Sequence, residues 1–183
     1  EHPVTEMIFG EDLVEWQLQV AVGHELPRDQ MELIPSGHAL EARLYAENPA
    51  RGFLPTGGVV DRFRLASTED YGGAVRIDSA VREGDEVSSH YDPMIAKVVV
   101  WGIDRDAALR RMTSVLDDLE IAGVVTNLLF LRRAFKHSAF AKAGVDTGFI
   151  ERFSDDLLTN PDAPSQETLA LASLSNMLRR GEK

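Results

Sequence analysis

The hydrophobic and polar residues of this chain repeat in two periods, one typical of helices and the other of strands. Between Thr5 and Val22, apolar residues mostly fall three or four positions apart, which predicts a single helix capped by Thr5 and ended by Gly23. From His38 to Tyr45, polar and apolar residues alternate. This alternation predicts a half-buried strand with its polar groups, Glu41 and Arg43 among them, on one face.

The segments after this strand are short and are separated by Gly or Pro. They predict antiparallel strands joined by tight turns, at residues 59–65, 74–78, 86–87 and 94–100. Helical spacing then returns and predicts three helices, one from the cap Asp104 to about Asp118, one from the cap Thr126 through Phe135, and a short one around residues 147–158. The fold class is therefore α+β, with a mainly antiparallel sheet and flanking helices.

A stretch rich in Pro, Asn, Asp and Ser, residues 159–165, has the composition of a linker. We therefore predict a main domain at residues 1–158 and a separate helix at residues 166–183. That helix either docks on the main domain or begins a following one.

Composition narrows the classes of function. The chain has 183 residues, of which 44% are hydrophobic, and no apolar run approaches the roughly 18 residues that span a bilayer. The formal net charge is -11 and the basic residues do not cluster, which argues against nucleic-acid binding. There is no cysteine and the five histidines show no paired ligand spacing, so we expect neither disulfides nor a structural metal site.

Four motifs follow one another along the chain: EHPVTE at residues 1–6, HALEARLYAENP at 38–49, RGFLPTGG at 51–58 and VSSHYDPMIAKVVVWG at 87–102. This succession resembles the C-terminal domain of biotin carboxylases, from Glu1 to about Phe153. EHPVTEMI, DLVEWQL and DTGFIE are most similar to the alpha subunits of methylcrotonoyl-CoA carboxylases, and propionyl- and acetyl-CoA carboxylases come next. The resemblance implies a barrel-sandwich-like antiparallel sheet with flanking helices.

The resemblance also implies a reaction: ligases of this ATP-grasp family carboxylate carrier-bound biotin with bicarbonate and ATP. In the family, Glu1 corresponds to the base that takes the proton from bicarbonate, and Arg43 to the arginine that stabilises the charge on the biotin ureido ring. Tyr91 and Asp92 correspond to residues that line the biotin pocket and orient Arg43. The residues alone also allow other interpretations: a solvated Glu1, an Arg43 paired with Glu41 or Glu47, and an Asp92 that only shapes a turn.

The cofactors that the resemblance implies are biotin on a carrier domain, with ATP and Mg²⁺ in the intact enzyme. The implied partners are the remainder of the biotin carboxylase chain, the carrier domain, a carboxyltransferase beta subunit and a second copy in a homodimer. We expect this chain alone to bind none of the cofactors and to be inactive, because it lacks the family's glycine-rich lid, phosphate-binding lysines and magnesium ligands. A bacterial cytoplasmic enzyme is favoured, or a mitochondrial matrix enzyme if the source is eukaryotic, acting in leucine degradation or fatty acid metabolism.

Two alternatives remain. The chain is a non-catalytic binding or dimerisation module for a biotin carrier or a partner subunit, or it is the same domain from a propionyl-CoA, acetyl-CoA, pyruvate or urea carboxylase.

Overall fold

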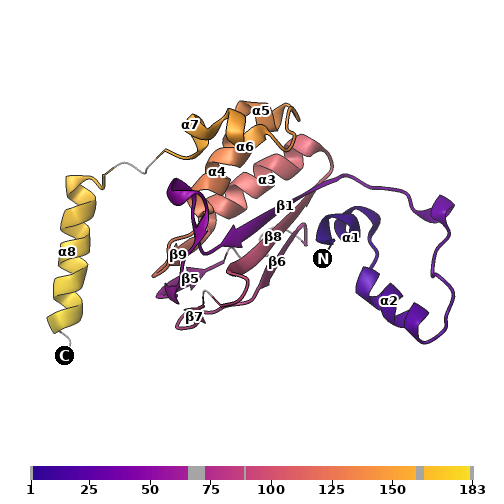
Figure 1. Ribbon diagram of the computed structural model, residues 1–183, viewed down its shortest axis with the longest axis horizontal. Coiled ribbons are helices and arrows are strands. Elements are labelled where there is room, and N and C mark those ends of the chain that lie inside the picture. Colours follow the sequence, from indigo (N-terminus) through magenta and orange to yellow (C-terminus); the bar gives the residue numbers. More distant parts are fainter. Residues whose placement is uncertain (1, 66–72, 89, 160–162, 182–183) are drawn as a thin grey trace.

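The computed structural model describes residues 2–65, 73–88, 90–159 and 163–181, so the candidate base Glu1 lies outside the described residues. At its centre is a three-stranded antiparallel sheet in the order β1 (His38–Tyr45), β8 (Met94–Gly102), β6 (Val75–Ser79). These strands correspond to those predicted at residues 38–45, 94–100 and 74–78, and the α+β class with an antiparallel sheet is confirmed (Figure 1).

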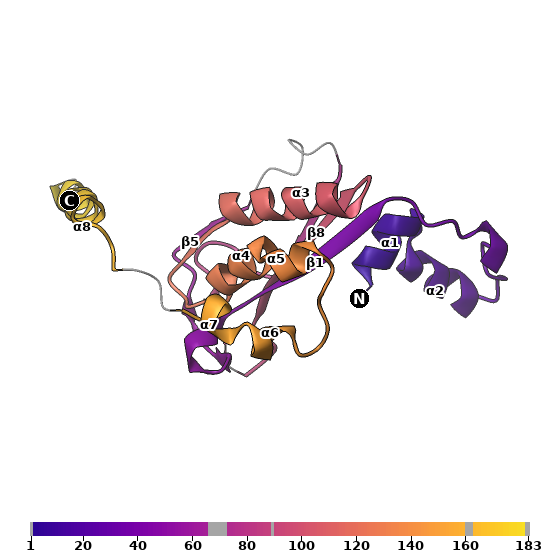
Figure 2. The ribbon, with the colours of Figure 1, turned by 90° about the horizontal axis from the view of Figure 1, so that it is seen from above.

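One face of this sheet is apolar and supports the core. The strand register places side chains from all three strands on it: Leu40, Ala42, Leu44, Ala96, Val98, Val100, Val75 and Ile77. Helices α3 (Arg105–Asp118) and α4 (Leu128–Lys136) cover this face with a matching stripe of buried residues (Figures 1 and 2). The approach of α3 to β8 requires glycine, because a Cβ at Gly102 would lie 2.3 Å from the backbone nitrogen of Ala108.

The predicted cap and end of α3 are confirmed, since the Asp104 side chain accepts a hydrogen bond from the Ala107 nitrogen. The predicted cap of α4 is wrong by one residue. Its N-cap is Asn127, and Thr126 accepts a long hydrogen bond of 3.4 Å from the Leu128 nitrogen. Beyond α4, the chain forms α5 (Ser138–Ala141), α6 (Phe149–Arg152) and α7 (Ser154–Leu157), so the single helix predicted around residues 147–158 is two short ones.

Short strands form three two-stranded ladders at the end of the sheet: β2 (Glu47–Asn48) with β3 (Leu54–Pro55), β4 (Gly58–Val59) with β7 (Glu86–Val87), and β5 (Arg62–Arg64) with β9 (Glu120–Ala122). The strand predicted at residues 59–65 is therefore divided between β4 and β5. The division has a local cause, because the Val60 nitrogen donates to Asp85 and the Asp61 nitrogen donates to Ala122, in a different ladder.

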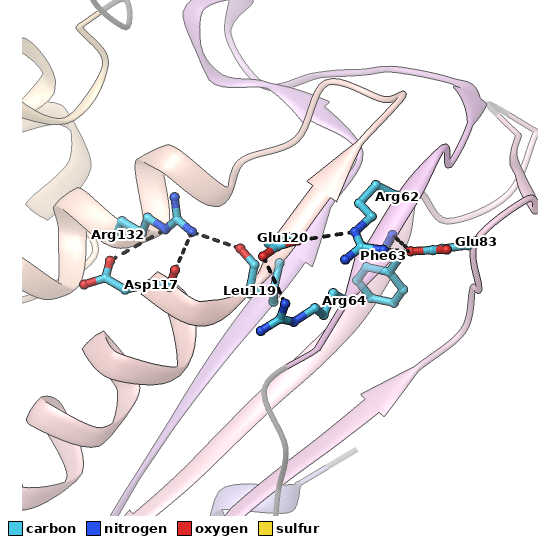
Figure 3. Close-up of polar contacts among 8 residues, drawn as sticks. All are labelled: Arg62, Phe63, Arg64, Glu83, Asp117, Leu119, Glu120 and Arg132. Carbon is cyan, nitrogen blue, oxygen red and sulfur yellow. Dashed lines mark hydrogen bonds and ion pairs between the residues drawn. The ribbon is translucent and has the colours of Figure 1, made fainter. Parts of the chain in front are cut away.

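Charged groups join the last ladder to its neighbours, as Figure 3 shows. The Glu120 carboxylate of β9 accepts a hydrogen bond of 3.3 Å from Arg62 and forms an ion pair of 3.6 Å with Arg64. The Glu83 carboxylate accepts hydrogen bonds from the Arg62 side chain and from the Phe63 backbone nitrogen. Arg132 of α4 donates to the Leu119 carbonyl at 2.9 Å and so ties α4 to the end of α3 (Figure 3).

The N-terminal segment differs most from its prediction. Instead of one helix from Thr5 to Val22 there are two, α1 (Pro3–Phe9) and α2 (Leu13–Ala21), because Gly10 adopts a left-handed conformation with φ 69° and ends α1. Asp12 then caps α2 by accepting from the Val14 and Glu15 nitrogens. Thr5 lies inside α1 and caps nothing, since Pro3 occupies the first helical position.

Helices α2 and α8 lie on opposite sides of the main body (Figures 1 and 2). Two single-turn 3₁₀ helices occur in connections, η1 (Gln30–Glu32) between α2 and β1 and η2 (Pro49–Arg51) between β2 and β3. The final helix, α8 (Gln166–Gly181), forms where the sequence predicts a helix and lies apart from the main body in both views (Figures 1 and 2). The proposed linker at residues 159–165 is only partly described, and the domain boundaries stay predictions.

Candidate functional site

Arg43 projects from the polar face of β1, opposite to the face that carries the core. Its Nε donates to Oε1 of Glu41 at 2.6 Å, and 48% of its side chain is exposed, against 16% for Glu41. The hydrogen bond and the negative charge of Glu41 raise the pKa of Arg43, and Tyr45 adds to the effect. The guanidinium is therefore charged, held by Glu41 and Tyr45, and about half exposed to solvent.

Other charged residues share the polar face with Arg43. Strand register places Lys97 of β8 directly opposite Arg43, and Asp78 of β6 opposite Lys97 on its other side. One row further, Arg76 pairs with Asp78 at 2.8 Å and with Glu6 of α1 at 2.7 Å, and both contacts raise the pKa of Arg76.

The helix α1 covers this second row and leaves the first row open. Val99 lies between Glu41 and Arg76 on the polar face and is fully buried, although α3 and α4 pack on the opposite face. Glu6 fixes α1 there, because one carboxylate oxygen binds Arg76 and the other accepts from the Leu13 nitrogen at the start of α2.

The segment of Tyr91 and Asp92 reaches the same end of the sheet. The Pro93 carbonyl accepts a 2.9 Å hydrogen bond from the Ala46 nitrogen, three residues after Arg43, and Asp92 accepts from the Met94 nitrogen at 3.1 Å. Burial and the nearby Asp92 carboxylate together raise the pKa of Glu47.

The structure thus joins the backbones of the predicted site segments but does not bring all their side chains together. Tyr91 is 83% exposed. Within the described residues, the Arg43 Nε bond goes to Glu41 and not to Tyr91 or Asp92. Of the interpretations that the sequence leaves open, the pairing of Arg43 with Glu41 and the turn formed by Asp92 are both observed, and a role for these residues in biotin binding stays a prediction.

One residue of this region was missed by sequence reasoning. Asn127 is 5% exposed, and its side chain binds the backbone of β1 at Arg43 and Tyr45. The available signal was an asparagine directly before an amphipathic helix with an apolar first turn, where burial of a polar side chain demands hydrogen-bond partners. The sequence prediction at this point uses only Thr126, as the cap of a helix.

No group of three or more His, Asp or Glu side chains suited to a metal ion occurs in the described parts of the chain. No helix there is long and apolar enough to cross a membrane.

Residues 41–152 match the family described as the biotin carboxylase C-terminal domain. Among curated relatives, the mitochondrial methylcrotonoyl-CoA carboxylase subunit alpha of Oryza sativa subsp. japonica is 53% identical over 87% of this chain and 21% of its own length. The corresponding subunit of Rattus norvegicus is 46% identical over 100% of this chain and 25% of its own length.

Solved structures of biotin carboxylase domains are also similar to this chain. The biotin carboxylase domain dimer of the Hydrogenobacter thermophilus 2-oxoglutarate carboxylase, in complex with MgADP, ADP and bicarbonate, superposes with a TM-score of 0.82 at 34% identity. The match covers 88% of this chain and 35% of that one. The chain described here therefore spans about a fifth to a third of the length of these three proteins.

Proposed function

Because this chain belongs to the biotin carboxylase C-terminal domain family, we propose that it forms the C-terminal part of an enzyme that carboxylates carrier-bound biotin with bicarbonate and ATP. In this proposal the reaction is the first half-reaction of an acyl-CoA carboxylase. The likeness to methylcrotonoyl-CoA carboxylase alpha subunits from rice and rat favours methylcrotonoyl-CoA as the final acceptor.

The observation that carries the proposal is the setting of Arg43. A cation that is half-exposed, held at its Nε by Glu41 and placed on the open row of the polar face can approach a planar ureido ring while the rest of the chain stays unchanged. The planar fork of donors on a guanidinium suits an oxygen that gains negative charge, and a fixed cation stabilises such charge without reorganising. These properties fit biotin as the group that Arg43 contacts.

The remaining site residues have supporting roles in this proposal. Glu1 takes the proton from bicarbonate, and residues 3–6 of the EHPVTE segment belong to α1, which Glu6 and Arg76 fix against the sheet. Asp92 and Tyr91 line the pocket from the turn that binds Ala46. When bound, ATP would supply the phosphoryl group and Mg²⁺ would neutralise the charge on its phosphates; in this proposal both would bind to parts of the enzyme other than these residues.

The partners are the rest of the biotin carboxylase chain, a biotin carrier domain, a carboxyltransferase beta subunit and a second copy of the domain. Exposed apolar side chains in the N-terminal segment support a covering partner: Val14, Leu18, Val22, Leu26, Met31 and Ile34. Apolar patches of this kind on a folded domain mark surfaces that bind other protein. Alone, the chain is inactive, and the compartment proposed for its enzyme is the bacterial cytoplasm, or the mitochondrial matrix for a eukaryotic source.

The test is biotin carboxylation by the full-length enzyme that contains this chain. Replacement Arg43→Ala should lower the biotin-dependent rate by about a hundredfold or more, as expected for removal of a preorganised charge. Arg64→Ala is the matched control, because Arg64 also lies on a strand and pairs with a glutamate, at 63% exposure. Equal rates for the Arg43→Ala and Arg64→Ala enzymes would refute the assigned role of Arg43.

A further inference from the structure

Strand β1 lies at the edge of the three-stranded sheet, with β8 on one side only. Backbone groups of an edge strand that point away from the sheet have no strand partner. Alternate residues of a strand direct their backbone groups to the same edge, so Arg43 and Tyr45 share the outer edge of β1. This edge therefore carries the backbone of Arg43, the central residue of the site proposed above.

Asn127 occupies that outer edge in place of a strand. Its Oδ1 accepts the Tyr45 N–H at 2.9 Å, its Nδ2 donates to the Arg43 carbonyl at 3.1 Å, and its own backbone N–H donates to the Tyr45 carbonyl at 3.1 Å. One residue therefore satisfies three backbone groups on two residues of β1. It does so across 82 and 84 positions of sequence, which makes the contact a tertiary one.

The hydrogen bonds of Asn127 lie at the point where the pairing of β1 with β8 becomes irregular. The register of β1 with β8 shifts between Leu44 and Tyr45, so the ladder is irregular one residue after Arg43. A bulge of this kind bends a strand and re-aims the side chains beside it. Asn127 restrains the chain on both sides of the shift, at Arg43 and at Tyr45.

Asn127 is also the buried polar side chain among the described residues, at 5% exposure. Both side-chain atoms, Oδ1 and Nδ2, have a hydrogen-bond partner on β1. A buried amide with all its partners is stable, whereas loss of one partner leaves a buried polar atom unsatisfied and costs free energy. This arrangement gives the end of β1 a single defined geometry.

We propose that Asn127 is a positioning residue for the biotin-carboxylation reaction, acting through Arg43; this inference rests on the function proposed above. Asn127 touches no reacting atom. It fixes the backbone from which the Arg43 side chain projects, while Glu41 fixes the guanidinium end. A long side chain reaches a defined point only if both its root and its tip are held, and small displacements of a catalytic group cost large factors in rate.

The experiment is a double-mutant cycle in the full-length enzyme, with free biotin as the acceptor. Asn127→Asp keeps the acceptor for the Tyr45 N–H and loses the donor to the Arg43 carbonyl. We expect kcat for biotin carboxylation to fall about tenfold to a hundredfold, with the KM for ATP unchanged. In the Arg43→Ala background the same replacement should cost less than about twofold, because residues that act as one unit are not additive.

Leu157→Ala is the control for simple loss of stability. Leu157 is 1% exposed and lies on α7, so its truncation removes core packing and none of the hydrogen bonds between Asn127 and β1. At a temperature well below unfolding, it should leave kcat within about twofold of the wild-type value, as expected for a site outside the catalytic unit. If Asn127→Asp fails to fold, Asn127→Ser gives the same cycle with a smaller polar side chain.

The outcomes separate this inference from the function on which it rests. If Asn127→Asp reduces kcat by the same factor with and without Arg43, the positioning role is wrong and the proposed function stands. If Leu157→Ala reduces kcat as much as Asn127→Asp, the effect is loss of stability and the positioning role is again wrong. If Arg43→Ala itself leaves the rate unchanged, the proposed function has failed.

Discussion

The two faces of the central sheet are made by the same strands and differ in almost every other respect. On the inner face, residues such as Leu44 and Val98 are fully buried beneath α3 and α4. The outer face is the polar face described above, and it has a charged row that α1 leaves open, formed by Arg43, Lys97 and Asp78. Leu44 and Arg43 are consecutive in sequence, so a single peptide bond separates the core from the candidate site.

The two faces therefore contribute to different properties of the protein. Apolar burial on the inner face supplies free energy of folding, and its side chains have little freedom to change. Exposed ion pairs such as Arg43 with Glu41 contribute little to folding, so the outer face keeps charged groups for purposes other than stability. Changes on the two faces should therefore act on different measurements.

The largest effect is expected from Leu44→Ala on the inner face. Leu44 is 0% exposed, and truncating a buried leucine should lower the free energy of unfolding by about 2–5 kcal/mol because it leaves a cavity. Urea unfolding followed by circular dichroism measures this change. The control is Leu54→Ala on β3, where 54% exposure predicts a loss of about 0.5 kcal/mol or less. Equal losses in the two variants would show that the inner face is not the stabilising one.

A smaller effect is expected from Arg43→Ala, one residue away. The ion pair is 2.6 Å long but the arginine is half-exposed, so its removal should change the free energy of unfolding by less than about 1 kcal/mol. The same urea titration measures it. Glu41→Gln keeps an acceptor for the Arg43 side chain and should change the stability still less. A loss as large as that of Leu44→Ala would mean that Arg43 is a structural residue, and the comparison of the two faces would fail.

Local patterns in the sequence were enough to predict one of these faces. The alternation at residues 38–45 places Leu44 inside and Arg43 outside without any knowledge of partner strands, and it is confirmed. The apolar stripe of α3 is confirmed in the same way. Gly10 broke the prediction of one N-terminal helix, because apolar residues at helical spacing continue on both sides of it and conceal the left-handed turn.

The neighbours of Arg43 could not be predicted, because they depend on register and tertiary contact. Lys97 faces Arg43 only through the pairing of β1 with β8, which no local pattern specifies. Asn127 reaches β1 from more than eighty positions away. Family motifs indicated the segments that meet at the end of the sheet, but the contacts between them come from long-range packing.

The smallest effect concerns Glu47, just beyond the end of β1, and it depends on pH. Burial and the charge of Asp92 raise the pKa of Glu47 above 4.5, so the folded state binds this proton more tightly than the unfolded state. The contribution of the protonated group to stability is complete below the ordinary pKa and is lost as the pH rises through the raised one. At pH 7, Glu47→Gln should therefore raise the melting temperature slightly, and the difference should vanish below about pH 4. Asp92→Asn removes the second cause and should reduce the gain from Glu47→Gln; an unchanged gain would show that burial alone sets the pKa.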